Sequence, residues 1–484
     1  MELLQVIRDA KLSAEGYAAA QRAGVCVRCC LRFADVSDAE VYAHSDDKLL
    51  DAVHRFQQES NATGLSNGDI SAQDGGVLNR KFRDGLLDDV RRKAQESKYD
   101  ATTFALNIKL PSAVLLREYS LLEHFRGTVD RFPKKNPFDL KDTLKSLIAD
   151  EISKSFGNAT CTNASSFAVL VNIDHDESAE EVKQIPVIKH TLENARKRRR
   201  GPAPILDGFG AVNRAIGALT AMPSTIKCPP TLLQTQPTAE LVIERDPVYL
   251  QGRYLKFKRG LSQSPWVLDG VRMGESSVEE CIGDIALPYF RGASYKFHTA
   301  GREDVDVRML GNGRPFILEI IDAKKANLTQ EEYQQIQDAV NAANENAVEI
   351  RETKASTKEY FAGLQAGADS KKKTYCCVVW SERELTAEAV AKLDAIHDLA
   401  IQQETPIRVL HRRTLMTRPK VIHEAKCEVL NKHYMLLRLT TSAGTYVKEF
   451  VHGDRGRTLP NVSSILGSNA DILQLDVENL LDAA

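Results

Sequence analysis

Charged and apolar residues alternate through the stretch AGREDVDVRMLG at 300–311. In an extended chain, side chains two positions apart share a face, so this spacing predicts a strand with two unlike faces. The apolar face would carry Val305, Val307 and Met309. The charged face would carry Arg302, Asp304, Asp306 and Arg308. Two interpretations remain open: an ordinary solvated strand, or a carboxylate kept ionised in a cleft by neighbouring guanidinium groups.

The hydrophobic pattern changes near the middle of the chain. Helical periodicity dominates the first half, with strand patterns in FALNIKL and FAVLVNID, up to the Pro-rich passage CPPTLLQTQP at 228–237. Beyond it, short strand patterns dominate: GRYLKFKRG, YKFHT, FILEI, YCCVVW, YMLLRLTT and TYVKEFV. We therefore predict two domains, 1–235 and 236–484, the second an α+β domain with a mainly antiparallel sheet.

Two helices are predicted within the second domain. One is SSVEECIGDIAL, where Ser277 and Glu280 have the spacing of a capping box ahead of an apolar helical face. The other begins near Leu328, where Thr329 and Glu332 repeat the same spacing.

Composition narrows the class of protein. The chain is 43% hydrophobic and 27% charged, and no apolar run reaches the roughly 18 residues that a membrane helix needs. The formal net charge of -2 means that nucleic-acid binding would require basic residues gathered on one surface. We expect no membrane association and a location in the nucleus, the cytoplasm or both.

Cys26 and Cys29 have the spacing of half a zinc knuckle, and no second CxxC occurs in the chain. A structural zinc site needs four ligands. A reduced, semi-buried cysteine pair is the favoured interpretation, and no metal site is predicted.

The stretch GRYLKFKRGLSQSPW interleaves basic and aromatic residues, a mixture that suits unpaired RNA bases and their phosphates. Arg253, Lys256 and Lys258 are the candidate RNA contacts. The alternative is a strand with buried aromatics and a solvated basic edge. The run RKRRR at 196–200 could be a nuclear import signal, an RNA-contacting arm or a solvated loop.

Four long segments of the second domain, in this order, carry a family resemblance: GREDVDVRMLGNGRP, KTYCCVVW, LHRRTLMTRPKVIH and AGTYVKEFVHGDRGRTLPNVSSILGSNADILQLDVE. Together they resemble the tenth family of tRNA pseudouridine synthases, shared by archaea and eukaryotes, which isomerises uridines in the T-loop of tRNA. The resemblance covers roughly residues 238 to 482, and several long motifs in the right order are far more specific than one short motif.

This resemblance implies a role for each matching residue. Asp304 would be the catalytic carboxylate, Tyr375 would stack on the target base, and Lys448 would be the cationic partner of the aspartate. Val447 would be the apolar wall of the uracil pocket, with Tyr446 of the same motif also binding substrate. Arg302, with Arg308, would hold charge beside Asp304.

The resemblance further implies a pseudouridine synthase catalytic domain preceded by a THUMP-like α/β domain that binds RNA. The family's accessory domain has a zinc site of two CxxC pairs, of which only Cys26 and Cys29 are present here. Uridine isomerisation has no net redox change and needs no cofactor. We expect tRNA as the partner and a monomer as the active form.

Two other interpretations are weaker. A catalytically silent RNA-binding protein or tRNA chaperone would be expected to lack Asp304, Tyr375 or Lys448, and all three are present. A glycosidase could use Asp304 and Asp306, but nothing else in the sequence resembles a sugar cleft.

Overall fold

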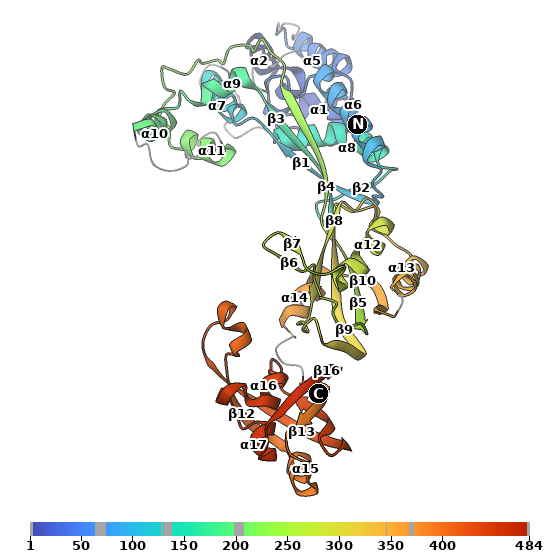
Figure 1. Cartoon of the computed structure of the whole chain (residues 1–484). Helices are drawn as coiled ribbons and strands as arrows, with labels where there is room; N and C mark the ends of the chain where they lie inside the picture. Colours follow the sequence, from blue (N-terminus) through green and yellow to red (C-terminus); the bar gives the residue numbers. More distant parts are fainter. Residues whose placement is uncertain are drawn as a thin grey trace. The chain divides into compact units, whose positions relative to one another are not determined.

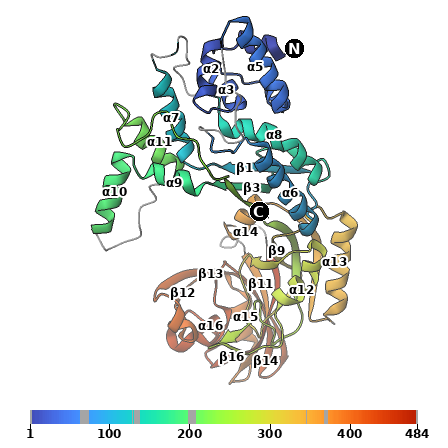
Figure 2. The same ribbon diagram turned by 90° about the horizontal axis from the view of Figure 1, so that it is seen from above.

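The computed structural model describes residues 3–62, 74–126, 129, 138–197, 208–344, 346–366 and 372–481. The chain forms two compact units, Met1–Arg245 and Asp246–Ala484, and each unit has its own hydrophobic core (Figures 1 and 2). No helix among the described residues combines the length and the apolar character needed to cross a membrane.

The first unit places helices around a four-stranded sheet. Its strands, in the spatial order β2-β1-β3-β4, are β1 Thr103–Lys109, β2 Thr160–Cys161, β3 Phe167–Asp174 and β4 Thr238–Arg245. Its helices are α1 Leu3–Asp9, α2 Ala14–Arg22, α3 Val27–Phe33, α4 Ala39–Ala43, α5 Asp46–Glu59, α6 Arg80–Ser97, α7 Ala113–Phe125, α8 Leu140–Ser155, α9 Asp176–Val182, α10 Pro186–Lys197 and α11 Phe209–Gly217. The basic run at 196–200 begins at the end of α10, and its residues 198–200 lie outside the described part.

Alternate side chains of β3 are buried, as its apolar pattern predicts. β1 pairs parallel with β2 and β3, whereas β4 pairs antiparallel with β3 from Thr238 to Arg245. This pairing places residues 238–245 in the first unit. The boundary between the units therefore follows residue 245, ten residues after the predicted boundary at 235.

The second unit is built on a ten-stranded sheet, in the order β10-β5-β9-β16-β11-β14-β13-β12-β15, with β8 pairing β9 beside this path. Its strands are β5 Val248–Lys256, β8 Ser294–Thr299, β9 Arg308–Ile321, β10 Val348–Ser356, β11 Lys372–Ser381, β12 His397–Glu404, β13 Thr417–Asn431, β14 Tyr434–Thr441, β15 Thr458–Leu459 and β16 Ala470–Leu481. Of the pairings described in this sheet, β16 with β9 is parallel and the others are antiparallel. The predicted α+β class with a mainly antiparallel sheet is confirmed.

Helices and a separate hairpin complete the second unit. They are the hairpin β6 Val267–Leu268 and β7 Val271–Arg272, the helices α12 Val278–Phe290, α13 Gln330–Ala343, α14 Lys358–Ala366, α15 Ala387–Asp394, α16 Val447–His452 and α17 Val462–Leu466, and the 3-10 segments η2 Ile407–Arg412 and η3 Gly453–Gly456. Both predicted helices are present. Thr329 and Glu332 form a reciprocal capping box at the start of α13, and Ser277 caps α12.

One predicted strand is shorter than expected, and another predicted strand is a helix. The stretch 300–311 is a strand only from Arg308 onward, because residues 300–307 form a loop in which the Val307 N–H donates to the Asp304 carbonyl (3.0 Å). The stretch TYVKEFV forms α16 instead. Val447, Phe450 and Val451 stand at i, i+3 and i+4, so a helix buries all three on one side.

Candidate active site

Asp304 lies in the loop between β8 and β9, and a buried lysine holds the backbone of that loop. The Lys256 ammonium donates to the carbonyls of Leu261 (2.8 Å), Asp304 (3.1 Å) and Val305 (3.3 Å), and the residue is 0% exposed. Burial lowers the pKa of Lys256. Because Lys256 binds main-chain carbonyls and not the carboxylate, the Asp304 side chain can point away from this lysine.

A buried ion pair supports the same loop. Glu303 and Arg314 are both about 1% exposed and lie 2.9 Å apart. The Tyr254 hydroxyl donates to Glu303 at 2.9 Å, and burial raises the pKa of this tyrosine well above its usual value. Such a pair is tolerated inside a protein when further hydrogen bonds satisfy its remaining atoms. Glu303 interrupts the apolar face of the predicted strand because it belongs to this polar cluster.

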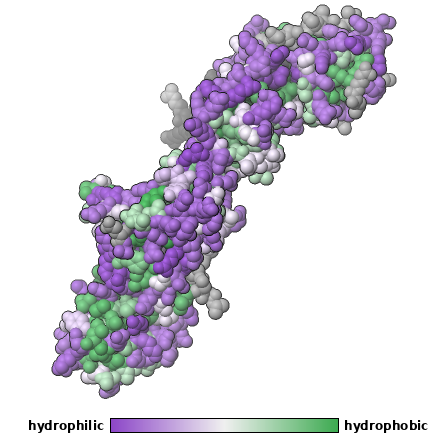
Figure 3. Space-filling view, turned by 90° about the vertical axis from the view of Figure 1, so that its right-hand side faces the viewer, coloured by the Kyte–Doolittle hydropathy of each residue, from purple (hydrophilic) through white to green (hydrophobic). Residues whose placement is uncertain are grey.

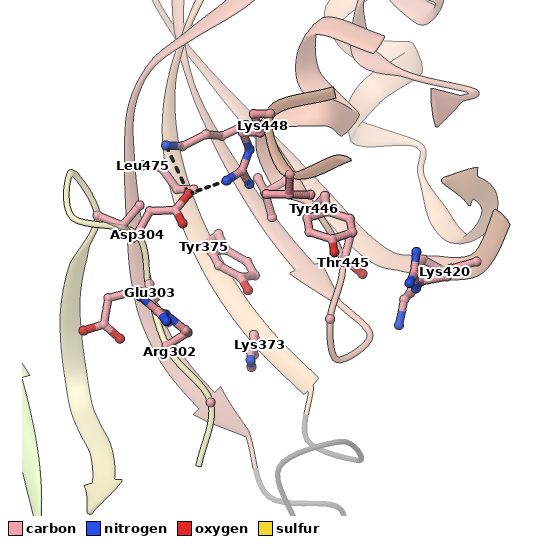
Figure 4. A pocket seen from close by; sticks show the side chains of 18 of the residues that line it. Arg302, Glu303, Asp304, Lys373, Tyr375, Lys420, Thr445, Tyr446, Lys448 and Leu475 are labelled. Carbon is pink, nitrogen blue, oxygen red and sulfur yellow. Dashed lines mark ion pairs between the residues drawn. The ribbon is translucent and has the colours of Figure 1, made fainter. Parts of the chain in front are cut away.

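Two cations meet the carboxylate of Asp304 at the same oxygen. Arg408 Nη1 lies 3.1 Å and Lys448 Nζ lies 3.4 Å from Oδ2; Figure 4 shows the two ion pairs as dashed lines. Oδ1 accepts no hydrogen bond from any residue in the described part of the chain. The side chain is 41% exposed, so Oδ1 is the oxygen that a substrate could approach.

Lys448 is shared between two carboxylates. Its ammonium also lies 2.8 and 2.9 Å from the oxygens of Asp306. Burial opposes ionisation of Asp306, but the hydrogen bond and charge of Lys448 lower its pKa overall. Arg308 pairs with Asp476 instead (3.0 Å). Arg308 is therefore not a partner of Asp304, and the cations that contact Asp304 come from distant segments of the chain. Arg302 lines the same cavity as Asp304, and its predicted role stays a prediction.

Asp304 opens onto a cavity of about 680 Å³. Its walls include the predicted residues Arg302, Tyr375, Tyr446, Val447 and Lys448. Figure 4 shows Tyr375 on its strand between Asp304 and Tyr446. Tyr375 is 8% exposed, and burial raises its pKa to about 12. One cavity thus combines a carboxylate, a buried aromatic ring and cations.

Comparison with known proteins identifies the family. The model "Eukaryotic Pus10, N-terminal" matches residues 75–242, and the model "Pus10, C-terminal" matches residues 249–481. The chain is 31% identical to the mouse (Mus musculus) tRNA pseudouridine synthase Pus10, over 94% of this chain and 95% of that protein. The chain belongs to the Pus10 family of pseudouridine synthases. The predicted family and the predicted enzyme class, an isomerase, are confirmed.

Two further comparisons each cover about half of this chain. The Pus10 protein of the archaeon Thermofilum pendens is 37% identical over 49% of this chain and 53% of its own length. Among solved structures, a Cbf5-Nop10-Gar1 complex is similar at 12% identity and a TM-score of 0.28, over 48% of this chain and 50% of that chain.

Several site residues of this Pus10 family member were missed in the sequence, among them Arg408, Leu475 and Gln403. Arg408 contacts Asp304, and Leu475 of β16 lines the cavity. Gln403 is 0% exposed and holds Tyr446 from both sides: its amide accepts from the Tyr446 N–H (2.9 Å) and donates to the Tyr446 carbonyl (3.0 Å). Leu475 lies within a segment that carries the family resemblance, which was the available signal, whereas Arg408 lies two positions before such a segment. Nothing in the pattern singles out Gln403.

Two of the three predicted RNA contacts, Arg253 and Lys256 of β5, need correction. Lys256 is buried under the Asp304 loop and cannot reach a phosphate. The Arg253 guanidinium donates to the carbonyls of Asn312 (2.6 Å) and Gly313 (3.0 Å). Lys258 is exposed, and its role stays a prediction. None of the three lines the cavity. Lys256 is buried, and Arg253 is bonded to carbonyls of β9.

Cys26 and Cys29 meet a third group, the carboxylate of Asp74, and the ligand atoms of the three lie within 4.8 Å of one another. Asp74 Oδ2 lies 3.4 Å from the Cys29 thiol and also accepts from the Leu78 N–H (3.3 Å), while Oδ1 accepts from the Gly76 N–H (2.9 Å). A structural zinc site needs four ligands, and Asp74 already receives backbone donors. The donor set in the described residues does not fit the family's zinc site.

Proposed function

We propose that the chain converts uridine to pseudouridine in the T-loop of tRNA, with Asp304 as the reacting carboxylate. The observation that carries this proposal is the arrangement of Asp304: two cations hold one carboxylate oxygen, and the other oxygen is open to a cavity beside Tyr375. The Pus10 relatives, including those of mouse and Thermofilum pendens, are named tRNA pseudouridine synthases.

The cavity suits a single flipped-out nucleotide. Its volume of about 680 Å³ falls within the roughly 300 to 1,000 Å³ of small-molecule sites. Removing a base from its stack costs a few kcal/mol, which stacking on an aromatic ring such as Tyr375 offsets in part. Val447 and Leu475 supply apolar surface for the edge of the uracil.

The chemistry requires an ionised carboxylate. Isomerisation breaks the bond from N1 to C1′, turns the uracil while it stays bound, and joins C5 to C1′; C5 loses its proton and N1 gains one, so the product is an isomer of the substrate. An ionised carboxylate can act as nucleophile or base. Arg408 and Lys448 form ion pairs with the carboxylate of Asp304. Because the reaction only exchanges a carbon–nitrogen bond for a carbon–carbon bond within one nucleotide, it needs no redox partner.

The second unit also exposes apolar side chains. Ile407, Leu410, Leu415 and Met416 are 44%, 38%, 71% and 53% exposed. Figure 3 shows apolar surface gathered at the lower end of the second unit, beside hydrophilic surface. Unpaired nucleotides favour such mixed surfaces, because bases contact apolar groups while phosphates pair with cations. A tRNA loop is a substrate of this kind.

The test uses an unmodified tRNA transcript and maps pseudouridine to nucleotide positions. Wild type should modify the T-loop, and Asp304→Asn should form no pseudouridine while its tRNA affinity stays within about 3-fold, since positioning contacts to phosphates and sugars remain. Asp306→Asn is the matched control, because Asp306 shares Lys448 but does not line the cavity; it should retain activity. Modification elsewhere in the tRNA, or an active Asp304→Asn enzyme, would refute the proposal.

A further inference from the structure

Arg408 connects two carboxylates at the site. Its Nε donates to Glu449 Oε1 at 2.7 Å, and its Nη1 lies 3.1 Å from Asp304 Oδ2. We infer that Arg408, held by Glu449, is a positioning residue that determines which oxygen of Asp304 reaches the uridine. This inference rests on the proposed role of Asp304.

The Glu449 end of this contact is fixed. Glu449 follows Lys448 in α16 and is 1% exposed. Its Oε2 is buried and has no hydrogen-bond partner in the described part of the chain. A buried carboxylate is costly unless it is paired. Separation of Arg408 from Oε1 would leave this carboxylate without its cation, so the guanidinium is held at its Nε edge.

The backbone and one ring further restrict Arg408. The preceding residue, Ile407, donates its N–H to Asp454 Oδ2 (3.1 Å), and Asp454 is 8% exposed. The Arg408 guanidinium carbon lies 6.0 Å from the centre of the Tyr446 ring, within reach of a cation–π contact. Thus the start of η2, the Tyr446 ring and Glu449 together direct Nη1 toward Asp304.

Lys448 alone would not fix the carboxylate in the same way. Its ammonium is a compact charge with rotatable donors, and it is already shared with Asp306. The planar guanidinium of Arg408 offers its donors in one fixed geometry. Because both cations contact Oδ2, they hold the carboxylate with Oδ1 toward the cavity. Loss of Arg408 should let the carboxylate turn and reduce the rate of chemistry rather than the affinity for tRNA.

The experiment measures the single-turnover rate of pseudouridine formation at saturating tRNA, the dissociation constant for the transcript and the thermal unfolding midpoint of the full chain. Arg408→Gln should lower the rate roughly 10- to 100-fold, the scale of a misplaced catalytic group, with the dissociation constant within about 2-fold of wild type. That variant alone leaves Glu449 buried and unpaired, and its midpoint should fall.

The double variant Arg408→Gln with Glu449→Gln separates positioning from stability. It removes the buried unpaired charge, so the midpoint should recover while the rate stays as low as in Arg408→Gln. The matched control is Arg8→Gln with Glu59→Gln, which neutralises an exposed Arg–Glu pair of the first unit (2.6 and 3.1 Å) and should leave the rate unchanged.

Two outcomes overturn the inference. A double variant that regains the wild-type rate would mean that Arg408 serves only to neutralise Glu449, and an unchanged rate in Arg408→Gln would remove its role altogether. Failure of the proposed function is recognised separately. In that case wild type would leave the T-loop unmodified, or Asp304→Asn would remain active.

Discussion

Tyr375 lies in surroundings that disfavour its ionised form. The ring is 8% exposed on β11, and burial raises the pKa of its hydroxyl to about 12, against about 10 for an exposed tyrosine. A neutral phenol suits a ring that stacks on a base, because a phenolate would add a negative charge beside Asp304 and repel the phosphates of RNA.

The raised pKa predicts how stability depends on pH. An acid whose pKa is raised by folding contributes stability below its unfolded pKa, and this contribution is lost as pH rises toward its folded pKa. Between about pH 9 and about pH 11.5, the free energy of unfolding of wild type should therefore fall by about 2 kcal/mol more than that of Tyr375→Phe. Denaturant unfolding of both proteins across this range measures the difference. If the two proteins differ by the same free energy of unfolding at every pH, folding does not raise the pKa of Tyr375.

The sequence was informative about the residues that line the cavity and less so about their partners. Tyr375, Val447 and Lys448 were found because they stand in motifs that resemble the family, and they lie around the same cavity as Asp304. Arg408 escaped notice because its contact with Asp304 spans about a hundred positions of sequence. Lys256 reads as a basic surface residue, and only the folded chain brings three carbonyls around its ammonium.

At the level of elements, the charged alternation of residues 300–311 was misread. Alternation predicts a strand when one face is solvated, but here the charged side chains serve three separate purposes. Asp304 faces the cavity, Asp306 pairs with Lys448, and Arg308 pairs with Asp476. Asp304 and Asp306 lie in the loop from 300 to 307, which can point their side chains in different directions, whereas Arg308 begins β9. The strands and helices with one buried face, such as β3 and α12, were predicted correctly.

Asp74 joins two segments of the first unit, the start of α3 and the turn before α6. Asp74→Asn keeps an acceptor for the Gly76 N–H but loses the charged acceptor facing the two thiols. The free energy of unfolding should fall by about 1 to 3 kcal/mol, measured by thermal or denaturant unfolding. Asp84→Asn is the control, since Asp84 forms an exposed ion pair with Arg80, worth about 0 to 1 kcal/mol.

The same unfolding measurement tests whether the protein contains a structural zinc ion. Because three side chains fall short of the four ligands of a structural zinc site, treatment with EDTA should leave the unfolding midpoint unchanged, and purified protein should contain well under one zinc per chain. A full equivalent of zinc whose removal lowers the midpoint would show that Asp74 acts as a ligand instead.

For the whole molecule, RNA binding must come from local charge, since the net charge is only -2. The Arg302 and Arg413 side chains line the cavity and have no hydrogen bond or ion pair with any described residue. Both are available for phosphates of a bound tRNA. In Figure 4, Arg302 and Lys373 lie at the end of the cavity opposite Lys448.

Affinity for tRNA should therefore fall steeply with salt, and Arg302→Gln should reduce the slope of log affinity against log salt by about 0.7 to 0.9. Titrations of labelled transcript at several NaCl concentrations measure this slope. Arg253→Gln is the matched control: its guanidinium donates to two carbonyls of β9, so the slope should not change. A flat salt response in wild type would rule out phosphate contacts as the source of affinity.

β16 is the last described strand in the sequence, yet it lies between β9, which follows the Asp304 loop, and β11, which carries Tyr375. During translation these two strands emerge from the ribosome long before residues 470–481. Until those residues arrive, the central gap in the sheet stays open and the carboxylate and the ring have no common wall. We therefore expect a nascent chain, or one that ends before residue 470, to lack the complete cavity and to form no pseudouridine.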